Sequence, residues 1–286
     1  MQPRVIVLGS SGMLALGIQN SLSQLGIQHT VIGRSTKPLK FDAASENTFE
    51  FARDSFRQED IVINCIGLTK AHINSESIHS LKTAIQVNSV FPNDLAIAAE
   101  QFGFRVIQVA TDCVFSGSQG GYSEESPHDA LDVYGKTKSL GESPSPNVMH
   151  LRCSLIGREA HDRNTLLYNW VSMQSHSARI SGYTNHIWNG LTNQVFGNIV
   201  GGIIKGGMKL AGAAHLVPAN TVTKAELVQM IATKENRLDI EITPEPADAA
   251  IDRTLSTLNP SLNSELFALA GYSQPPSIEQ MISDLI

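Results

Sequence analysis

Tyr134 and Lys138 are the two residues whose types and spacing first indicate chemistry. They are four positions apart, so on a helix they project from the same face. A free tyrosine titrates near about 10, and a neighbouring ammonium lowers that pKa because it favours the phenolate. Beside a nicotinamide, Tyr134 could then donate a proton to a carbonyl that receives hydride. Thr111, which follows the apolar run 106–110, could hold the carbonyl oxygen by a hydrogen bond.

Taken alone, this spacing is more typical of a solvated helical face, because it occurs by chance in many helices. A second pattern changes that interpretation. Residues 4–12 read Arg-Val-Ile-Val-Leu-Gly-Ser-Ser-Gly, which predicts a buried strand, a glycine-rich turn and the start of a helix. Such a turn lets the backbone approach a pyrophosphate, to which the helix N-terminus presents free N–H groups. An ordinary strand-turn-helix connection is the alternative.

The residues after the second expected strand, 29–33, indicate which nicotinamide cofactor is used. They read Arg34-Ser35-Thr36-Lys37, and no carboxylate occurs until Asp42. An acidic residue here would bind the ribose 2′-hydroxyl of NAD, whereas a basic residue accommodates the 2′-phosphate of NADP. The sequence therefore predicts NADP(H), with a solvent-facing basic cluster as the alternative.

The composition excludes several classes of protein. The chain has 286 residues, of which 42% are apolar and 17% charged, as in soluble globular proteins. A net charge of -6 argues against nucleic acid and anionic membranes as partners. The three cysteines, Cys65, Cys113 and Cys153, form no C-x-x-C pair, and the apolar run before Gly9 is too short for a signal peptide. We therefore expect a cytoplasmic protein.

The elements that must position these residues alternate regularly up to residue 157. Strands are expected at 5–8, 29–33, 61–65, 106–110 and 149–154, and helices at 14–25, 46–56 and 83–102. This alternation predicts an α/β fold with a doubly wound parallel sheet (Rossmann), which binds ligands at the carboxyl ends of its strands. The less regular remainder predicts a smaller C-terminal α/β lobe. We expect a cofactor domain over 1–157, completed by parts of 185–217, and mainly a substrate-binding lobe over 158–286.

Taken together, the motifs resemble one known family. The chain is similar to the extended short-chain dehydrogenase/reductases, and within them to the dTDP-4-dehydrorhamnose reductase-like group of nucleotide-sugar reductases. The motifs that carry the resemblance are Gly9-Ser10-Ser11-Gly12-Met13-Leu14, Asn64-Cys65-Ile66-Gly67, Val87-Asn88, Thr111-Asp112-Cys113-Val114-Phe115, the run from Tyr134 to Glu142, and Trp188-Asn189-Gly190-Leu191-Thr192.

The resemblance implies NADPH-dependent reduction of the keto group of a nucleotide-activated deoxysugar, in the synthesis of surface polysaccharide sugars. It implies that Thr111, Tyr134 and Lys138 are catalytic. No metal site is expected, because His72 and His79 are too far apart for a helical ligand pair and have no acidic residues converging on them. The cofactor-binding residues it implies, besides Tyr134 and Lys138, are Gly9, Ser11, Gly12, Met13, Leu14, Arg34, Ser35, Asp42, Cys65, Ile66, Gly67 and Asn88. The substrate-binding residues it implies are Asp112, Cys113, Trp188, Asn189, Thr192 and Arg253.

The chain departs from the family pattern at two of these motifs. Ala15 stands where a third glycine is usual, and Cys113 stands where a tyrosine is common, which leaves the sugar open. Without the resemblance, Asn88 would be interpreted as a surface residue. Arg253 is a candidate for binding a phosphate, with a surface salt bridge as an equal alternative.

Two other functions remain open from the sequence. An epimerase or dehydratase of nucleotide sugars would use the same fold, although dehydratases usually place an acid pair where only Asp112 is present. A non-catalytic NADP-binding regulatory subunit is the second, since the group includes a subunit of methionine adenosyltransferase. Members often form dimers, so a homodimer is a possible assembly. The sequence leaves open the sugar, the nucleotide, the product stereochemistry, the oligomeric state and any metal at a dimer contact.

Overall fold

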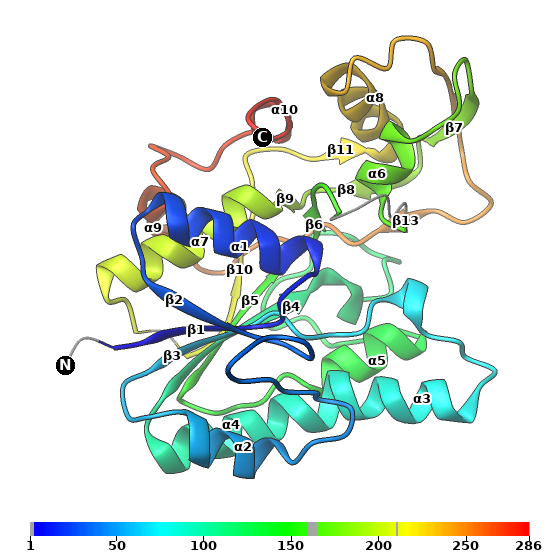
Figure 1. The fold of residues 1–286 in the computed structure, drawn as a ribbon. Helices are drawn as coiled ribbons and strands as arrows, with labels where there is room; N and C mark the ends of the chain where they lie inside the picture. Colours follow the sequence, from blue (N-terminus) through cyan, green and yellow to red (C-terminus); the bar gives the residue numbers. More distant parts are fainter. Residues whose placement is uncertain (1–2, 160–164, 210, 286) are drawn as a thin grey trace.

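A sheet of six parallel strands forms the centre of the molecule (Figure 1). The computed structural model describes residues 3–159, 165–209 and 211–285. The strands lie in the order β10-β5-β4-β3-β1-β2, so the chain starts one strand from an edge, moves to that edge with β2 and then crosses the sheet to the other edge. This doubly wound order confirms the predicted fold class. The strands are β1 Val5–Leu8, β2 His29–Ile32, β3 Ile61–Asn64, β4 Arg105–Thr111, β5 Val148–Cys153 and β10 Gly212–His215.

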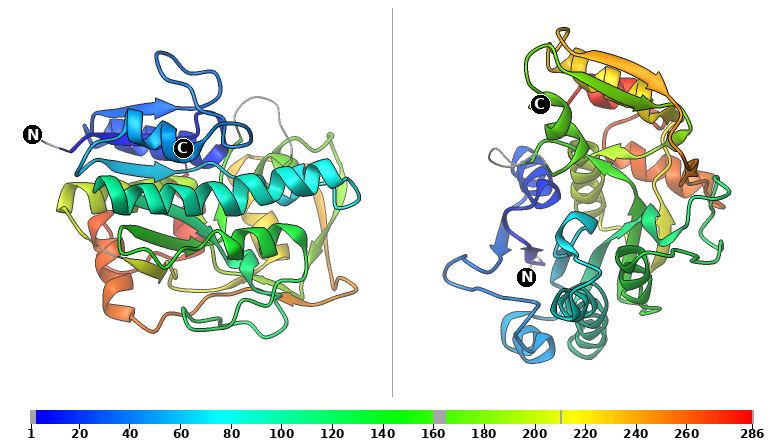
Figure 2. Two further views of the ribbon diagram at one scale, coloured as in Figure 1. Left: turned by 90° about the horizontal axis from the view of Figure 1, so that it is seen from below. Right: turned by 90° about the vertical axis from the view of Figure 1, so that its right-hand side faces the viewer.

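Helices cover both faces of this sheet, as Figures 1 and 2 show. Strands covered on both faces read as continuous apolar runs, and β1 and β3 are buried along their whole length. One face carries α1 Met13–Gln24, α7 Asn193–Gly206 and α9 Pro260–Leu269, and the other carries α2 Thr48–Ser55, α3 Ile78–Ile85, α4 Phe91–Phe102 and α5 Val133–Leu140.

The helix expected at 83–102 begins earlier than predicted. It starts at Ile78, because the Ser77 hydroxyl caps it by accepting a hydrogen bond from the Ser80 N–H. It then runs through a π-helical turn, η2 Gln86–Val90, into α4, so that α3, η2 and α4 form one rod (Figure 2). Short π segments inside helices occur frequently at functional sites.

A smaller lobe follows β5 and lies beyond the carboxyl ends of the sheet strands (Figure 1). It contains a three-stranded sheet in the order β11-β8-β13 and two strand pairs, β12-β7 and β6-β9. Its strands are β6 Leu155–Ile156, β7 Arg179–Tyr183, β8 His186–Trp188, β9 Leu191–Thr192, β11 Val222–Thr223, β12 Glu241–Glu245 and β13 Ile251–Asp252. Its helices are α6 Leu167–Ser172, α8 Lys224–Lys234 and α10 Ile278–Ser283. The predicted C-terminal α/β lobe is present, and α7 and β10 return to the main sheet.

Candidate active site

The turn between β1 and α1 is built for close approach of a ligand. Gly9 has φ +103°, a conformation that side chains disfavour, and a Cβ there would lie 3.3 Å from the Cys65 backbone carbon. Gly12 is the N-cap of α1, and a Cβ on it would have no atom within 4 Å. No side chain caps this helix, and its first turn holds no acidic residue, so the N–H groups of that turn stay available to an anion.

A cavity of about 330 Å³ opens at this turn, at the carboxyl ends of β1, β2 and β3. It lies beside the point where the strand order reverses, the usual ligand position of this fold. Of the residues predicted to bind cofactor, nine line it: Gly9, Ser11, Gly12, Met13, Arg34, Asp42, Cys65, Ile66 and Gly67. Leu14, Ser35, Asn88, Tyr134 and Lys138 are not among its lining residues.

The sequence reasoning missed several cavity residues. Thr69 and His72 follow β3, and Glu159, Thr165 and Leu166 reach the cavity from the start of the smaller lobe. A signal existed for the first two, because they follow a strand whose carboxyl end was already predicted to meet the cofactor. The other three come from a stretch without regular pattern.

Thr111 and Tyr134 meet where β4 ends. The Thr111 hydroxyl donates to the Asp112 carboxylate at 3.2 Å and accepts from the Cys113 N–H at 3.2 Å. Thr111 also acts on the Tyr134 phenol, whose pKa it lowers against the effect of burial. The predicted pair of oxygen-holding and proton-donating side chains is therefore brought together, from β4 and α5 respectively.

Three contacts hold α5 in this position. Asp132 caps it by accepting from the Gly135 N–H at 2.8 Å, and the other carboxylate oxygen accepts from Lys70 Nζ at 3.0 Å. A side chain at Gly135 would collide with the Cys113 carbonyl oxygen, so the helix packs directly on the turn after β4. From the other side, Ser89 Oγ donates to the Thr137 carbonyl at 2.7 Å.

Asn88 is buried and links segments of the same region by hydrogen bonds. The alternative interpretation of Asn88 as a surface residue is therefore wrong. Its exposure is 2%, because it lies in the π-helical turn that faces α5. Its amide donates to the Leu68 carbonyl at 3.0 Å and to Thr137 Oγ1 at 3.2 Å, while Oδ1 accepts from the Leu68 N–H. Asn88 thus joins a cavity residue, Leu68, to the helix that carries Tyr134 and Lys138.

The expected effect of Lys138 on Tyr134 is wrong for this structure. Burial raises the pKa of the Tyr134 phenol, and the electrostatic interaction with Cys113 raises it further. Lys138 Nζ instead donates to the Val109 carbonyl of β4 at 3.1 Å, and burial lowers the pKa of this lysine. The four-residue spacing places both side chains on α5, but the ammonium turns to a strong backbone acceptor.

The residues predicted to contact substrate divide into two groups. Asp112, Cys113 and Arg253 lie near the catalytic residues: burial raises the pKa of Asp112, and the Arg253 guanidinium opposes this. Burial also raises the pKa of Cys113 to about 12, so its thiol is not activated. Arg253 Nε donates to the Phe115 carbonyl at 2.9 Å, so Arg253 is no surface ion pair.

Trp188, Asn189 and Thr192 are buried, and their polar atoms have protein partners. The Trp188 indole donates to Ser154 Oγ at 2.8 Å. Asn189 exchanges two hydrogen bonds with the Leu255 backbone, and Thr192 Oγ1 caps α7. These contacts give all three a structural task, and their assignment to substrate stays a prediction.

Lys224 is a site residue that the sequence analysis did not single out. It is the first residue of α8, after Thr223, whose side chain forms a capping box with Glu226. Its ammonium lies 5.3 Å from the centre of the Trp188 ring and interacts electrostatically with Asp112, Cys113 and Arg253. Burial lowers the pKa of Lys224 to about 8. Two cations, Lys224 and Arg253, therefore face one carboxylate beside Tyr134.

Within the residues that the structure describes, no group of three or more histidine, cysteine, aspartate or glutamate side chains could hold a metal ion. In the same part of the chain, every helix is too short or too polar to cross a membrane.

Comparison with known proteins identifies a family over nearly the whole chain and curated relatives over about half of it. The family model of the RmlD substrate binding domain matches residues 3–286. The chain is 34% identical over 142 residues to a dTDP-4-dehydrorhamnose reductase from Streptomyces griseus, covering 49% of this chain and 44% of the relative. It is 30% identical over 183 residues to a probable low-salt glycan biosynthesis reductase from Haloferax volcanii, covering 58% of each. The matched stretches thus span about half the length of these curated relatives.

A solved structure shares the fold over nearly the full length. It is a dTDP-4-dehydrorhamnose reductase from Bacillus anthracis in complex with NADP, with a TM-score of 0.76, 20% identity, and coverage of 99% of this chain and 98% of that one.

Proposed function

This chain belongs to the RmlD substrate binding domain family, and on that basis we propose that it is an NADPH-dependent reductase of a nucleotide-activated deoxysugar, acting on its keto group as a dTDP-4-dehydrorhamnose reductase does. The family resemblance seen in the motifs is thereby confirmed. The proposal depends on one observation. Thr111, Tyr134 and Lys138 lie together near the carboxyl end of β4, at the same edge of the sheet as the cavity at the β1-α1 turn.

The residues present fit NADP(H). Gly12 leaves open space above an uncapped helix N-terminus, where a pyrophosphate would lie. Arg34 lines the cavity and Ser35 is its neighbour, and we assign both to the 2′-phosphate. Asp42 would lie near the adenine, and Gly67 near the nicotinamide side. We keep Leu14 and Asn88 in the set as positioning residues. When bound, the reduced cofactor supplies the hydride.

The chain's own residues would handle the proton and the substrate oxygen. Because its pKa is raised, Tyr134 stays protonated at neutral pH, the state that a proton donor to a reduced carbonyl requires. Thr111 would hold the same oxygen. Asp112, Cys113 and Arg253 would bind the nucleotide sugar, with Lys224 as a fourth contact. The epimerase and regulatory-subunit alternatives are not favoured, since both curated relatives named above are reductases.

Four further assignments belong to this proposal. Residues 1–157, completed by parts of 185–217, would bind the cofactor, and residues 158–286 would mainly bind substrate. In the synthesis of surface polysaccharide sugars, the enzyme would act in the cytoplasm. A homodimer is the proposed assembly.

Oxidation of NADPH, followed by absorbance, tests the proposed function. The substrates are a panel of nucleotide-linked 4-keto-6-deoxy sugars, with NADH as the cofactor control. We expect turnover with one panel member, faster with NADPH. The Tyr134→Phe variant should lose on the order of 10²- to 10⁴-fold in kcat while it still binds NADPH, because only the donated proton is removed. Tyr183→Phe, a change at an exposed tyrosine of the lobe, is the control. Equal turnover by both variants would refute the role of Tyr134.

A further inference from the structure

Arg152 is a buried cation on the sheet strand β5. The proposed reaction does not explain its role. Its exposure is 2%. In the sheet it is paired with Ala110 of β4, one residue before Thr111, and with His215 of β10. Side chains in register on parallel strands point to the same face, so Arg152 and His215 lie together. A buried charge requires partners, because its desolvation is otherwise uncompensated.

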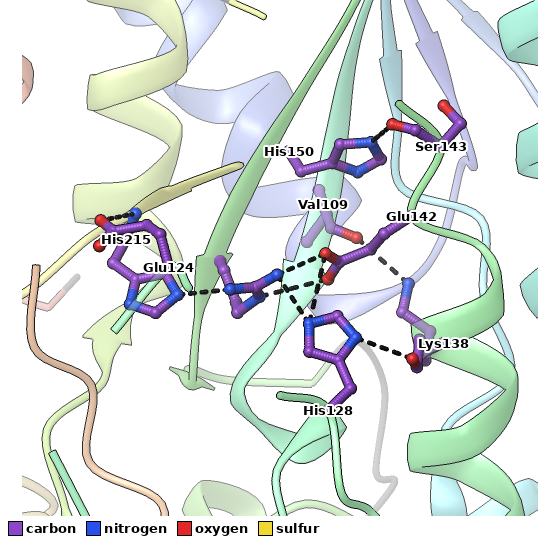
Figure 3. Close-up of polar contacts among 10 residues, drawn as sticks. Val109, Glu124, His128, Lys138, Glu142, Ser143, His150 and His215 are labelled. Atoms are coloured by element: carbon purple, nitrogen blue, oxygen red, sulfur yellow. Dashed lines mark hydrogen bonds and ion pairs between the residues drawn. The ribbon is translucent and has the colours of Figure 1, made fainter. Parts of the chain in front are cut away.

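Its guanidinium contacts Glu142, His128 and His215, three residues from separate parts of the chain that Figure 3 labels. It donates to the two Glu142 oxygens at 2.5 and 3.3 Å, and Glu142 follows directly after α5. It also donates to His215 Nε2 at 2.5 Å and to His128 Nε2 at 3.0 Å. His128 belongs to the loop between β4 and α5, and His215 ends β10.

These contacts fix the protonation state of both histidines. An arginine has only donors, so the two Nε2 atoms must accept and carry no hydrogen. The remaining ring nitrogens then carry the proton. His128 Nδ1 donates to Ser139 Oγ at 2.7 Å, and His215 Nδ1 donates to the Ser256 carbonyl at 2.7 Å. Both imidazoles are therefore neutral in this arrangement.

The network joins the catalytic helix to the segment 252–258. On one side, Ser139 is next to Lys138 on α5, and Glu142 interacts electrostatically with Lys138. On the other side, Ser256 is three residues from Arg253, which reaches the Phe115 backbone. Glu124 strengthens this side, because it accepts hydrogen bonds from the His215 N–H, Thr257 Oγ1 and the Leu258 N–H.

We propose that Arg152 is a positioning residue that fixes α5 relative to the segment 252–258 through hydrogen bonds to neutral His128 and His215. Protonation of either histidine breaks its hydrogen bond to Arg152 and loosens this arrangement. The inference rests on the proposed function for its effect on turnover, but not for its effect on the histidines. A protonated imidazole can no longer accept from Arg152 and places a second positive charge against it.

The charges around the two histidines set the direction of titration. Burial lowers the pKa of both, and Arg152 lowers each further. Glu142 opposes this at both sites, with Asp129 at His128 and Glu124 at His215. His150, also on β5, lies against the same charges: burial lowers its pKa, as do Arg152 and Lys138, while Glu142 raises it. The histidines therefore stay neutral at neutral pH and protonate on the acid side.

Glutamine variants test the effect on turnover. His128→Gln and His215→Gln keep an oxygen that can accept from Arg152 and remove the titrating group. We expect kcat of the unaltered enzyme to fall about tenfold per pH unit below the higher of the two apparent histidine pKa values, and the fall to flatten in the double variant. His79→Gln, at an exposed position of α3, is the matched control and should keep the acid fall. An acid fall that is identical in the double variant and in this control would overturn the proposal.

A second measurement does not depend on turnover. Histidine ring NMR of the full chain, titrated from about pH 8 to pH 5, reports the tautomer and pKa of each imidazole. We expect His128 and His215 to hold the proton on Nδ1 and to titrate below about 6.5, the value of an unperturbed imidazole. If no nucleotide sugar is reduced, the proposed function fails and this titration decides alone. Titration of both histidines near the unperturbed value of about 6.5 would overturn the network.

Discussion

Lys224 shows how one side chain can adjust substrate binding to pH. Its ammonium faces Asp112 and Arg253, and Trp188 supports it through a cation–π contact of 5.3 Å. With a pKa of about 8, it is mostly charged at neutral pH and mostly neutral about a unit above that value. A diphosphate or other anionic substrate group beside Asp112 would therefore bind more tightly below that pKa.

Replacing Lys224 by methionine should weaken substrate binding more than it slows the chemical step. We expect KM to rise about tenfold near neutral pH, the size of one charge-assisted contact, with a smaller change in kcat. The alkaline rise of KM in the unaltered enzyme should be lost in the variant, because the titrating amine is gone. Steady-state kinetics at about one pH unit on either side of the lysine pKa measure both effects. Lys205→Met, at an exposed end of α7, is the control. An unchanged alkaline rise in Lys224→Met would contradict the assignment.

Residue types and spacing predicted the contact of Thr111 with Tyr134, but not the direction of the tyrosine pKa. A four-residue spacing indicates which side chains share a helical face. It gives no information on burial or on competing acceptors such as the Val109 carbonyl. Lys224 was missed for a related reason. Its neighbours Thr223 and Glu226 form a capping box, which is a sufficient structural explanation for the motif.

At the scale of elements, α5 depends on contacts outside itself. It has eight residues and includes Gly135 and Thr137, both poor helix formers, so it would not be stable alone. The Asp132 cap and the hydrogen bonds from Asn88 and Ser89 stabilise the helix, whose own residues favour helix formation only weakly. Tyr134 lies in the first turn, so the cap acts directly on the catalytic residue.

The Asp132→Ala variant tests this dependence. Loss of the cap on the Gly135 N–H should cost about 1 kcal/mol of the free energy of unfolding. We also expect kcat to fall several-fold, since the first turn of α5 carries Tyr134. Urea unfolding and steady-state kinetics measure the two effects. Ser77→Ala removes the N-cap of α3 and is the control, expected to lower stability without lowering kcat. Equal kcat values in the two variants would show that the cap has no catalytic role.

The elements themselves were predictable where their pattern is long and simple. The apolar runs before Gly9 and Thr111 predicted β1 and β4, because strands covered on both faces contain little else. The π-helical turn was not predictable. It inserts an extra residue into the helical period, so Asn88 faces inward where a period of 3.6 gives no reason for it.

At the scale of the whole molecule, the sequence alone did not predict which distant segments contact each other. The alternation of strands and helices was enough for the doubly wound sheet. The close packing of α1 on α7 was not, although glycines mark it: a Cβ on Gly197 would lie 2.6 Å from Ser21 Oγ. Glycines at a helix contact permit such an approach, but one sequence does not state which helices meet. The short strands of the smaller lobe carry too few residues for a pattern.

Acid sensitivity of folding is the prediction that belongs to the whole molecule. Burial lowers the pKa of His128, His150 and His215, so the folded state binds fewer protons than the unfolded state on the acid side. Stability from these groups is complete above the unfolded pKa of about 6.5 and is lost as pH falls through the lower folded values. Each histidine contributes a slope of at most about 1.4 kcal/mol per pH unit.

Urea unfolding at a series of pH values measures this loss. We expect the midpoint to decrease steadily below about pH 6.5 with an unchanged m-value, because the exposed surface on unfolding stays the same. His150 adds to the loss, since its Nε2 donates to the Ser143 carbonyl and its buried Nδ1 has no partner that could stabilise a second proton. In His128→Gln/His215→Gln, the decrease should be shallower, because only His150 of the three still titrates. The glutamine oxygens keep the Arg152 contacts, so the two curves should coincide above about pH 6.5 and separate in acid, where the unaltered chain loses more stability. A midpoint that is flat down to about pH 5 in the unaltered chain would show that the three imidazoles protonate without cost.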